Sequence, residues 1–287
     1  MILITGATGN VASLLIPALR EAGEQVRALV HDVSKAQTLE DLGVEVVIGD
    51  MERPETLAKA VAGVDQIYLI TSNGPASARQ AKNVIAAAKE AGTPKIVRQS
   101  AYGTSKSRII QQHEEIEEEL EHSELPYTVV KPTFFMQNVM MAAQTVASDG
   151  AVYAPMKDGR LGMIDLRDVA EVAHKVLTTG GHDGKTYVLT GPASISFHDV
   201  ARGLSSVLQK EVSYIDVPPK AAREAMVGMG LPEWIADGFV ELFDGFSRGF
   251  ADSTTSNVEQ LTGHPARSFE TFARDYADMF GGVSNKA

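Results

Sequence analysis

The chain has 287 residues, of which 44% are hydrophobic and 22% charged, so it fits one large globular domain or two closely joined ones. Its 26 Lys and Arg residues against 37 Asp and Glu residues give a formal charge of −11, which disfavours nucleic acid and anionic membrane surfaces as partners. The absence of cysteine excludes disulfides, thiolate metal sites and cysteine nucleophiles. No apolar run approaches the roughly 18 to 20 residues that a membrane span needs, and no targeting peptide is recognisable, so we expect a cytoplasmic protein.

The first 130 residues alternate short apolar runs with longer amphipathic ones, a pattern typical of strands and helices in turn. The expected strands cover residues 2–5, 25–30, 44–48, 65–70, 95–99 and 127–130, and the expected helices cover 11–22, 35–42, 54–61, 76–91 and 105–122. Gly23, Gly43, Gly63 and Gly92 each stand just before a new strand, where a left-handed residue closes a helix at low cost. The alternation predicts an α/β fold with a doubly wound parallel sheet and right-handed crossovers.

After about residue 150 this pattern loosens. Short expected strands at 161–164, 186–189 and 212–217 mix with expected helices at 169–177, 200–208 and 233–250. We therefore predict a first domain over residues 1–150 and a smaller C-terminal α+β part over residues 151–287, closely packed on the first without a flexible linker.

A glycine-rich loop follows the first strand and opens a helix: Thr5-Gly6-Ala7-Thr8-Gly9-Asn10-Val11-Ala12. In this context Gly6 permits a tight turn and Gly9 lets the backbone approach a pyrophosphate, whose charge is met by the helix N-terminus. The loop predicts that the first domain is an NAD(P)-binding Rossmann domain. The residues of the loop expected at the cofactor are Gly6, Thr8, Gly9, Asn10 and Val11.

The residues after the second strand bear on the choice between NAD and NADP. A carboxylate there favours the ribose of NAD, whereas cationic groups favour the 2′-phosphate of NADP. His31 and Lys35 are both placed to reach a phosphate, and Asp32 fits a helix cap, so we favour NADP(H) over NAD(H). Asp50 and Met51 end the third strand and fit an adenine site, although Asp50 fits an N-cap equally well. Further residues expected at the cofactor lie past later strands: Thr71, Ser72, Ser100, Pro132, Thr133 and Phe134.

These residues resemble the NmrA-like branch of the atypical short-chain dehydrogenase/reductase superfamily, and the likeness covers nearly the whole chain. The segments that carry it are Ile4–Gly9, Val26–Val30, Gly49-Asp50, Leu125–Pro132, Phe134–Asn138, Asp168–Ala170 and Leu261–Pro265. The resemblance implies a nicotinamide cofactor. The branch includes NAD(P)H:quinone oxidoreductases and triphenylmethane-dye reductases, and also regulators that bind the dinucleotide with no known catalysis.

Conventional members of the superfamily carry a Tyr-x-x-x-Lys pair on the helix after the fifth strand, where the lysine lowers the tyrosine pKa. The segment from Tyr102 to Lys106 matches this motif, but Gly103 and the short distance from the strand place Tyr102 in a loop. Aligned on the helix instead, the family's Lys-x-x-x-Glu pattern falls on His113 and Glu117, with Ile109 at the tyrosine position.

Tyr102 and His113 are therefore the candidates for proton transfer. The resemblance equally allows His113 to bond the nicotinamide ribose, and the acidic residues around it equally fit a histidine on a solvated helix face. Tyr102 also fits the wall of a substrate pocket, because ligands of open α/β sheets bind at the carboxyl ends of strands.

Methionine and aromatic residues follow Pro132 and recur between residues 234 and 250, a pattern more often found in a core than in a pocket. The candidates for the substrate wall are Tyr102, Phe135, Met136 and Trp234. The seven histidines show no metal-binding spacing, so no metal is predicted, and Asp165 and Asp168 resemble caps of the following helix.

These features predict an NAD(P)H-dependent oxidoreductase that transfers hydride to a quinone-like or other conjugated acceptor, a small hydrophobic or aromatic molecule. One alternative is a non-catalytic NADP(H)-sensing regulator that acts through a protein partner. Another is a ketone or imine reductase that uses Tyr102 and Lys106. We expect a monomer or a homodimer.

Overall fold

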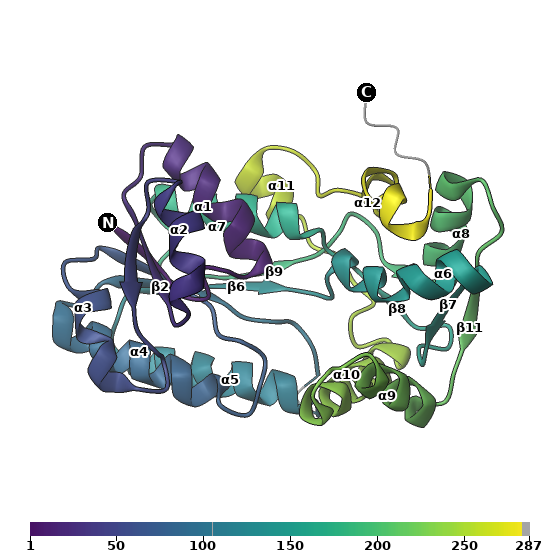
Figure 1. Cartoon of the computed structure of the whole chain (residues 1–287), viewed down its shortest axis with the longest axis horizontal. Coiled ribbons are helices and arrows are strands. Elements are labelled where there is room, and N and C mark those ends of the chain that lie inside the picture. The colour runs from purple at the N-terminus through teal and green to yellow at the C-terminus, as the bar shows by residue number, and fades with distance from the viewer. Residues whose placement is uncertain (105, 283–287) are drawn as a thin grey trace. The chain divides into compact units, whose positions relative to one another are not determined.

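The computed structural model describes residues 1–104 and 106–282, and its main feature is a seven-stranded sheet (Figure 1). The strands run in the order β3-β2-β1-β4-β5-β6-β9. Their bounds are β1 Ile2–Ile4, β2 Val26–Val30, β3 Glu45–Ile48, β4 Gln66–Leu69, β5 Lys95–Gln99, β6 Tyr127–Pro132 and β9 Thr186–Leu189. Each of the five pairs from β3 to β6 is parallel, and the strand order reverses between β1 and β4. Such a reversal is where ligands bind in open α/β sheets.

Helices cover both faces of this sheet, which confirms the doubly wound α/β fold. Figure 1 shows α1 and α7 on one side and α4 and α5 on the other. The α-helices on the two faces of the sheet are α1 Asn10–Glu21, α2 Ala36–Glu40, α3 Ala58–Val61, α4 Ser77–Ala91, α5 Arg108–His122 and α7 Leu166–Thr178, with 3₁₀ turns η1 Val33–Lys35 and η2 Pro54–Thr56. One core cluster joins Leu3, Ile67 and Ile96 of the strands to Val84 of α4 and Ile116 of α5. Burial of these side chains, at roughly 25 cal/mol per Å² of apolar surface, is what holds the layers together.

The expected elements of the first 130 residues all occur, with ends shifted by a few residues. Gly23, Gly43, Gly63 and Gly92 have φ between 66° and 120°, as the helix-closing role requires. The helix expected from residue 105 begins at Arg108 instead, and Ser105 lies outside the described residues. The strand expected at 161–164 is reduced to β8 (Arg160–Leu161), because Ile164 leaves it to form an isolated bridge with Phe135.

The chain divides into two compact units, each made of three separate stretches. Unit 1 comprises residues 1–101, 111–131 and 169–187, and unit 2 comprises residues 102–110, 132–168 and 188–287. The chain therefore passes between the two units several times, whereas the sequence suggested a single boundary at residue 150. The reason is that β9, which borders β6 in the large sheet, comes from a late part of the chain.

Unit 2 contains two small sheets, one joining β7 (Ala151–Ala154) to β11 (Ser213–Asp216) in parallel and one joining β8 to β10 (Ile195–Ser196) antiparallel. Its helices are η3 Met136–Ala142, α6 Ala143–Asp149, α8 Phe197–Leu208, α9 Pro219–Gly228, α10 Glu233–Ser247, α11 Asn257–Thr262, α12 Phe269–Asp275 and η4 Ala277–Phe280. A capping box of Ser196 and Asp199 starts α8. Within the described ranges no helix is long and apolar enough to cross a membrane.

Candidate functional site

The glycine loop at the end of β1 is held by the neighbouring strand β4. The Thr5 hydroxyl donates to the carbonyl of Ile70 at 2.7 Å and accepts from the Ile70 amide at 2.8 Å. Gly6 follows with φ +58°, and a Cβ there would lie 3.1 Å from the Ile70 side chain. Only glycine adopts this conformation readily in so narrow a space, so the turn depends on Gly6. Thr5 is a positioning residue that the sequence pattern did not single out.

The helix α1 presents an unblocked N-terminus directly after this turn. Gly9 is its N-cap, no side chain caps it, and no acidic residue lies in its first turn. The Gly9 amide donates to the Gly6 carbonyl at 2.9 Å, and a Cβ on Gly9 would lie 3.1 Å from the same oxygen. The positive end of the helix dipole and its first-turn amides, including that of Asn10, are thus available to an anion. Val11 has a buried side chain, so only its backbone can take part.

A cavity of about 380 Å³ opens beside this loop within unit 1. It lies between the glycine loop and the ends of β2 and β3, with the first turns of α4 on another side. The predicted cofactor residues that line it are Gly6, Thr8, His31, Lys35, Asp50, Met51 and Ser72. The structure therefore brings together most of the residues expected at the adenosine half of a dinucleotide.

The three polar residues after β2 have different roles in this cavity. The Asp32 carboxylate accepts the Ser34 amide at 2.9 Å and caps η1. Hydrogen bonds from the Ser34 side chain and then from its amide, with smaller help from Lys35 and His31, lower the pKa of Asp32. Because the carboxylate is committed to the turn, the side chains of His31 and Lys35 supply the cationic character of the lining.

On the β3 side of the cavity, Asp50 also forms hydrogen bonds within its own loop. Its carboxylate accepts the Glu52 amide at 2.8 Å, and its own amide donates to Thr56. Gln80, on α4, was not anticipated: it lines the cavity and donates to Glu52, while its Oε1 has no hydrogen-bond partner among the described residues. No sequence signal marks Gln80, because its place depends on how α4 crosses the strand ends.

Past β4 and β5, polar side chains form a buried group rather than a cavity wall. Thr71 is 8% exposed, and its hydroxyl bonds Ser77 and the guanidinium of Arg98. Ser100 is 3% exposed and donates a short hydrogen bond to Glu117, which also pairs with Lys131 at 2.8 Å. The side chains of Thr71 and Ser100 are thus occupied within the protein, in contrast to Ser72.

His113 belongs to this buried group and is 7% exposed, so the alternative of a histidine on a solvated helix face is wrong. Its Nδ1 lies 3.0 Å from an Arg98 nitrogen, and burial, followed by the charges of Arg98 and Lys131, holds its pKa well below 6.5. A proton relay near neutral pH is therefore disfavoured. The signal was present in the sequence: Ile109, His113, Ile116 and Leu120 recur at helical spacing and all are buried.

Tyr102 lies in the loop before α5, as expected. Its amide donates to the Pro132 carbonyl at 2.8 Å, and its ring centroid lies 5.5 Å from that of Phe250. Lys106 is exposed and precedes the helix, which begins at Arg108. The two side chains therefore do not share a helix face, and the i,i+4 arrangement of a conventional Tyr-Lys pair is missing.

Unit 2 has its own cavity of about 550 Å³, lined mainly by apolar side chains of η3, α6, α9 and α10. Phe134, expected at the cofactor, lines this cavity together with Phe239 and Phe243. The ring centroid of Phe134 lies 5.7 Å from that of Phe243. Asp149 is the only charged side chain among the described lining residues.

None of the four predicted substrate residues, Tyr102 included, is among the described residues that line this cavity. Met136 is 1% exposed and belongs to the core, because it is packed beneath Gly191. Phe135 and Trp234 are half-buried but outside the described lining of this cavity. Pro132 and Thr133, expected at the cofactor, are buried, and the Thr133 hydroxyl lies within bonding distance of the Gly162 and Leu189 carbonyls.

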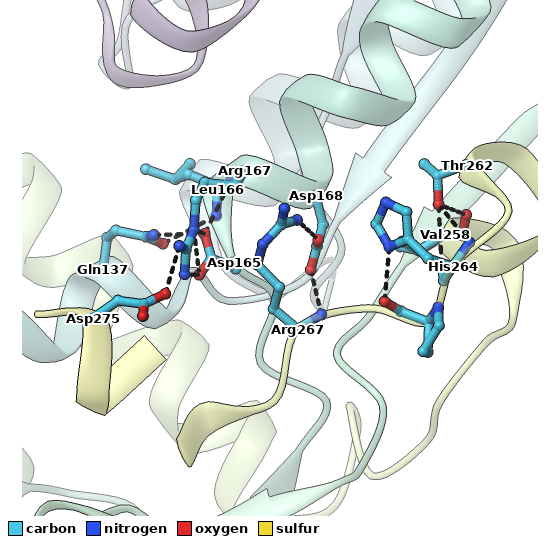
Figure 2. A network of polar contacts seen from close by, with 11 residues as sticks. Gln137, Asp165, Leu166, Arg167, Asp168, Val258, Thr262, His264, Arg267 and Asp275 are labelled. Atoms are coloured by element: carbon cyan, nitrogen blue, oxygen red, sulfur yellow. Dashed lines mark hydrogen bonds and ion pairs between the residues drawn. The ribbon is translucent and has the colours of Figure 1, made fainter. Parts of the chain in front are cut away.

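A polar network fixes the segment that supplies part of this cavity wall (Figure 2). Gln137 of η3 donates to Asp165 at 2.9 Å, and Arg167 bonds both Asp165 and Asp275. Asp165 accepts the Arg167 amide and so caps α7, as predicted. Burial alone would raise its pKa, but the hydrogen bonds from Arg167 and Gln137 lower it.

Asp168 does not share this capping role. Its carboxylate is fully buried and holds both the backbone amide and the guanidinium of Arg267 (Figure 2). Burial raises its pKa despite this partner. Within the described part of the chain, no group of acidic or histidine side chains forms a metal site.

Known proteins resemble this chain in sequence and in fold. A model of the NmrA-like family matches residues 1–273. The chain belongs to the NmrA-like family. Among its relatives, this NmrA-like protein is 36% identical to an NAD(P)H azoreductase of Xenophilus azovorans over 284 residues, which covers 98% of this chain and 99% of the relative.

Two solved structures of enzymes resemble the NmrA-like protein over nearly all of both chains. An NADPH-dependent quinone oxidoreductase of Escherichia coli, complexed with NADPH, matches with a TM-score of 0.87 and 30% identity, covering 94% of this chain and 97% of that one. A Citrobacter triphenylmethane reductase complexed with NADP(H) matches with a TM-score of 0.85 and 31% identity, covering 94% and 98%. The fold predicted from the sequence, and the resemblance noted there, are confirmed.

Proposed function

We propose that this NmrA-like protein is an NAD(P)H-dependent oxidoreductase that transfers a hydride to a quinone-like or other conjugated acceptor. The observation that carries the proposal is the unblocked N-terminus of α1 behind Gly6 and Gly9, beside a cavity that the same loop lines. The names of the three relatives support it, since each is a reductase that uses or binds NAD(P)H.

The residues of the unit 1 cavity fit this cofactor. A Cβ at Gly6 or Gly9 would enter space that the turn needs, and the unpartnered Oε1 of Gln80 is an acceptor without a donor. The first-turn amides of α1 would hold the pyrophosphate, with Asn10, Val11 and Thr8 closest in sequence. Met51 and Asp50 would flank the adenine, and Ser72 would lie on the same wall.

We further propose that NADP(H) is preferred over NAD(H). His31 and Lys35 line the cavity and would bind the 2′-phosphate, whereas Asp32 is committed to capping η1. The carboxylate that would select the unphosphorylated ribose is therefore engaged elsewhere.

The nicotinamide, when bound, supplies the hydride, and the proton that a quinone or azo acceptor also needs comes from water. Reduction of conjugated acceptors then depends mainly on orientation, which is compatible with the missing Tyr-Lys pair. Ser100, next after β5, and Pro132–Phe134, at and after the end of β6, stay candidates for the nicotinamide half. His113 would donate to the nicotinamide ribose. Tyr102 stays a candidate for contact with the acceptor, although it is outside the described lining of the unit 2 cavity.

The acceptor would occupy the cavity of unit 2. Its lining of Phe134, Phe239, Phe243 and Met226 suits a hydrophobic or aromatic molecule, since apolar walls with few polar groups are typical of such sites. Because Asp149 is the only charge on the described lining, we propose that neutral and cationic acceptors are favoured over anionic ones.

The test is oxidation of NADPH and NADH against quinones, azo dyes, triphenylmethane dyes and simple ketones, with both cofactors titrated in parallel. We expect turnover with conjugated acceptors and a lower Kd for NADPH. Tight binding without any turnover would overturn the enzyme assignment in favour of the sensing regulator. Turnover confined to ketones or imines, and lost by on the order of 10²-fold in Tyr102→Phe, would favour the third alternative.

We propose a cytoplasmic location for this activity. The charge of −11 argues against a nucleic acid partner. We expect a monomer or a homodimer, which sedimentation equilibrium would measure.

A further inference from the structure

Arg98 is a fully buried cation in the strand β5, and its contacts are unusual. Its guanidinium donates to the Leu69 carbonyl at 3.0 Å, to the Thr71 hydroxyl at 3.2 Å and to Nδ1 of His113 at 3.0 Å. The Nε atom has no hydrogen-bond partner among the described residues. Burial lowers the pKa of Arg98 to about 10, which still leaves it charged at neutral pH. The charge of Glu117 favours the cation, but no carboxylate among the described residues forms an ion pair with Arg98, and such a buried charge is costly.

The contact with His113 determines which imidazole nitrogen carries the proton. A guanidinium has N–H donors only, so Nδ1 of His113 must accept the hydrogen bond. The imidazole is then neutral with its proton on Nε2, because an imidazolium would direct an N–H at the N–H of a buried cation. Arg98 thus fixes both the charge and the tautomer of His113.

The surroundings of His113 give no support to its charged form. Arg98 on β5 and Lys131 on β6 both oppose a positive imidazole. On α5 itself, Glu117 lies one turn away, but its carboxylate is engaged by Lys131 and Ser100. Tyr68 on β4 is buried with a raised pKa and is therefore uncharged. On the α4 side, Ser77 bonds Thr71, which is neutral.

We propose that Arg98 is a positioning residue that keeps His113 neutral and protonated on Nε2, so that His113 is a permanent hydrogen-bond donor to the cofactor and not a proton carrier. The recipient of this hydrogen bond rests on the proposed function, because it is a ribose oxygen of the nicotinamide half. Thr71 and Ser100 belong to the same buried group as His113 and lie just past β4 and β5, at the sheet edge where ligands of open α/β sheets bind; none of the three is in the described lining of the unit 1 cavity. His113 remains 7% exposed and makes no other side-chain hydrogen bond among the described residues.

The direct test needs no cofactor. In protein labelled with ¹⁵N-histidine, NMR distinguishes protonated from unprotonated imidazole nitrogens, and the loss of one signal in His113→Gln assigns it among the seven histidines. We expect a proton on Nε2 only, with no titration between pH 8 and pH 5.5. A proton on Nδ1, or a titration centred at pH 6 or above, would overturn the proposal.

Two substitutions at the same position extend the test to cofactor binding. In Arg98→Met the hydrogen-bond donor to Nδ1 is lost, so His113 should sample both tautomers and begin to titrate. At pH 8 the affinity for NADPH should then fall about threefold to tenfold. It should recover towards pH 6, where the imidazolium donates from both nitrogens. Arg98→Lys keeps a buried cationic donor and should preserve the wild-type tautomer and a pH-independent Kd.

These outcomes separate the two proposals. If the wild-type protein failed to bind NADPH, the proposed function would fall, while the histidine spectrum would still decide the tautomer. If Arg98→Met did not fold, the wild-type spectrum and Arg98→Lys would remain decisive. An Arg98→Met protein that folds and binds NADPH with an unchanged, pH-independent Kd would contradict the positioning role.

Discussion

Gly9 is the position where one added side chain should interfere most with cofactor binding. In Gly9→Asp the new Cβ would lie 3.1 Å from the Gly6 carbonyl, and the carboxylate would occupy the helix end that should receive the pyrophosphate. We expect NADPH binding, followed by quenching of protein fluorescence, to weaken by at least about a hundredfold, a loss of about 2.7 kcal/mol.

Gly180→Asp provides the matched control for this substitution. A Cβ at Gly180 would meet no atom within 4 Å, and the residue lies in the same unit but outside the cavity lining. It should bind NADPH as the wild type does. Unchanged affinity in a folded Gly9→Asp protein would refute the assignment of the phosphate loop.

The side chains of His31 and Lys35 should determine the preference for a phosphorylated ribose. Removing either in His31→Ala or Lys35→Ala deletes a hydrogen bond to a charged group, worth about 1.5 to 3 kcal/mol, and should raise the Kd of NADPH about tenfold or more. The Kd of NADH should change by less than about twofold. Lys89→Ala, which removes an exposed lysine at the other end of α4, controls for net charge. An equal loss for both cofactors in isothermal titration would rule out the assigned 2′-phosphate contact.

The polar network of Figure 2 connects secondary-structure elements to one another, so breaking it should lower the free energy of unfolding. Arg167 bonds a fully buried carboxylate, Asp165, and an exposed one, Asp275. We expect Asp165→Asn to lower the free energy of unfolding in urea by about 3 to 5 kcal/mol, because it breaks a buried pair and weakens the hold on Gln137. Asp275→Asn should cost at most about 1 kcal/mol, since its pair is exposed. Similar losses for the two variants would contradict this division.

The pH dependence of the same comparison follows from the lowered pKa of Asp165. Because the folded-state pKa lies below the ordinary value of 3.8, the stabilisation is complete above that value and is lost as the pH falls from there through the lower folded-state pKa. The difference in stability between the wild type and Asp165→Asn should therefore be constant from pH 7 to pH 5 and shrink below pH 4. A difference that grew on acidification would show that the carboxylate is not the stabilised form.

The elements that the sequence predicted well are those with local signals. The apolar run of β1, the glycine loop and the start of α1 follow each other in a few residues, so their geometry could be inferred directly. The capping role of Asp165 was likewise local. The sequence left the burial of His113 open, because the acidic residues around it fitted a solvated face as well as a role at the cofactor, although the stripe from Ile109 to Leu120 indicated burial.

The cavity of unit 2, the proposed acceptor site, could not be predicted in the same way. Its wall combines Phe134 from the end of β6 with Met226 on α9 and Phe243 on α10, which are far apart in the chain. Which face of each helix turns inward depends on packing, and so Phe239 lines the cavity while Phe246 lies in the core. The composition of the aromatic series was visible in the sequence, but its division between core and cavity was not.

The overall negative charge should influence which acceptors react fastest. With a net charge of −11 and Asp149 at the cavity, a cationic dye should have a kcat/KM about tenfold above that of an anionic dye of similar size at an ionic strength of about 0.01 M. The ratio should fall at about 0.15 M, where screening acts within about 8 Å. Asp149→Asn should lower the ratio at both ionic strengths, whereas Glu90→Gln, an exposed control with the same charge change, should not. A ratio independent of both salt and Asp149 would contradict this electrostatic preference.

The repeated passage of the chain between its two units has a consequence for folding during synthesis. The strand β9 borders β6 in the large sheet, yet it is made only after the stretch 132–168 of unit 2 has left the ribosome. Until residue 189 is available, β6 presents an unpaired edge, which is the kind of surface that joins another strand in aggregation. Neither unit is one continuous fragment, so exchanging the lining of the unit 2 cavity as a single segment, from Phe134 to Phe243, would also replace part of unit 1.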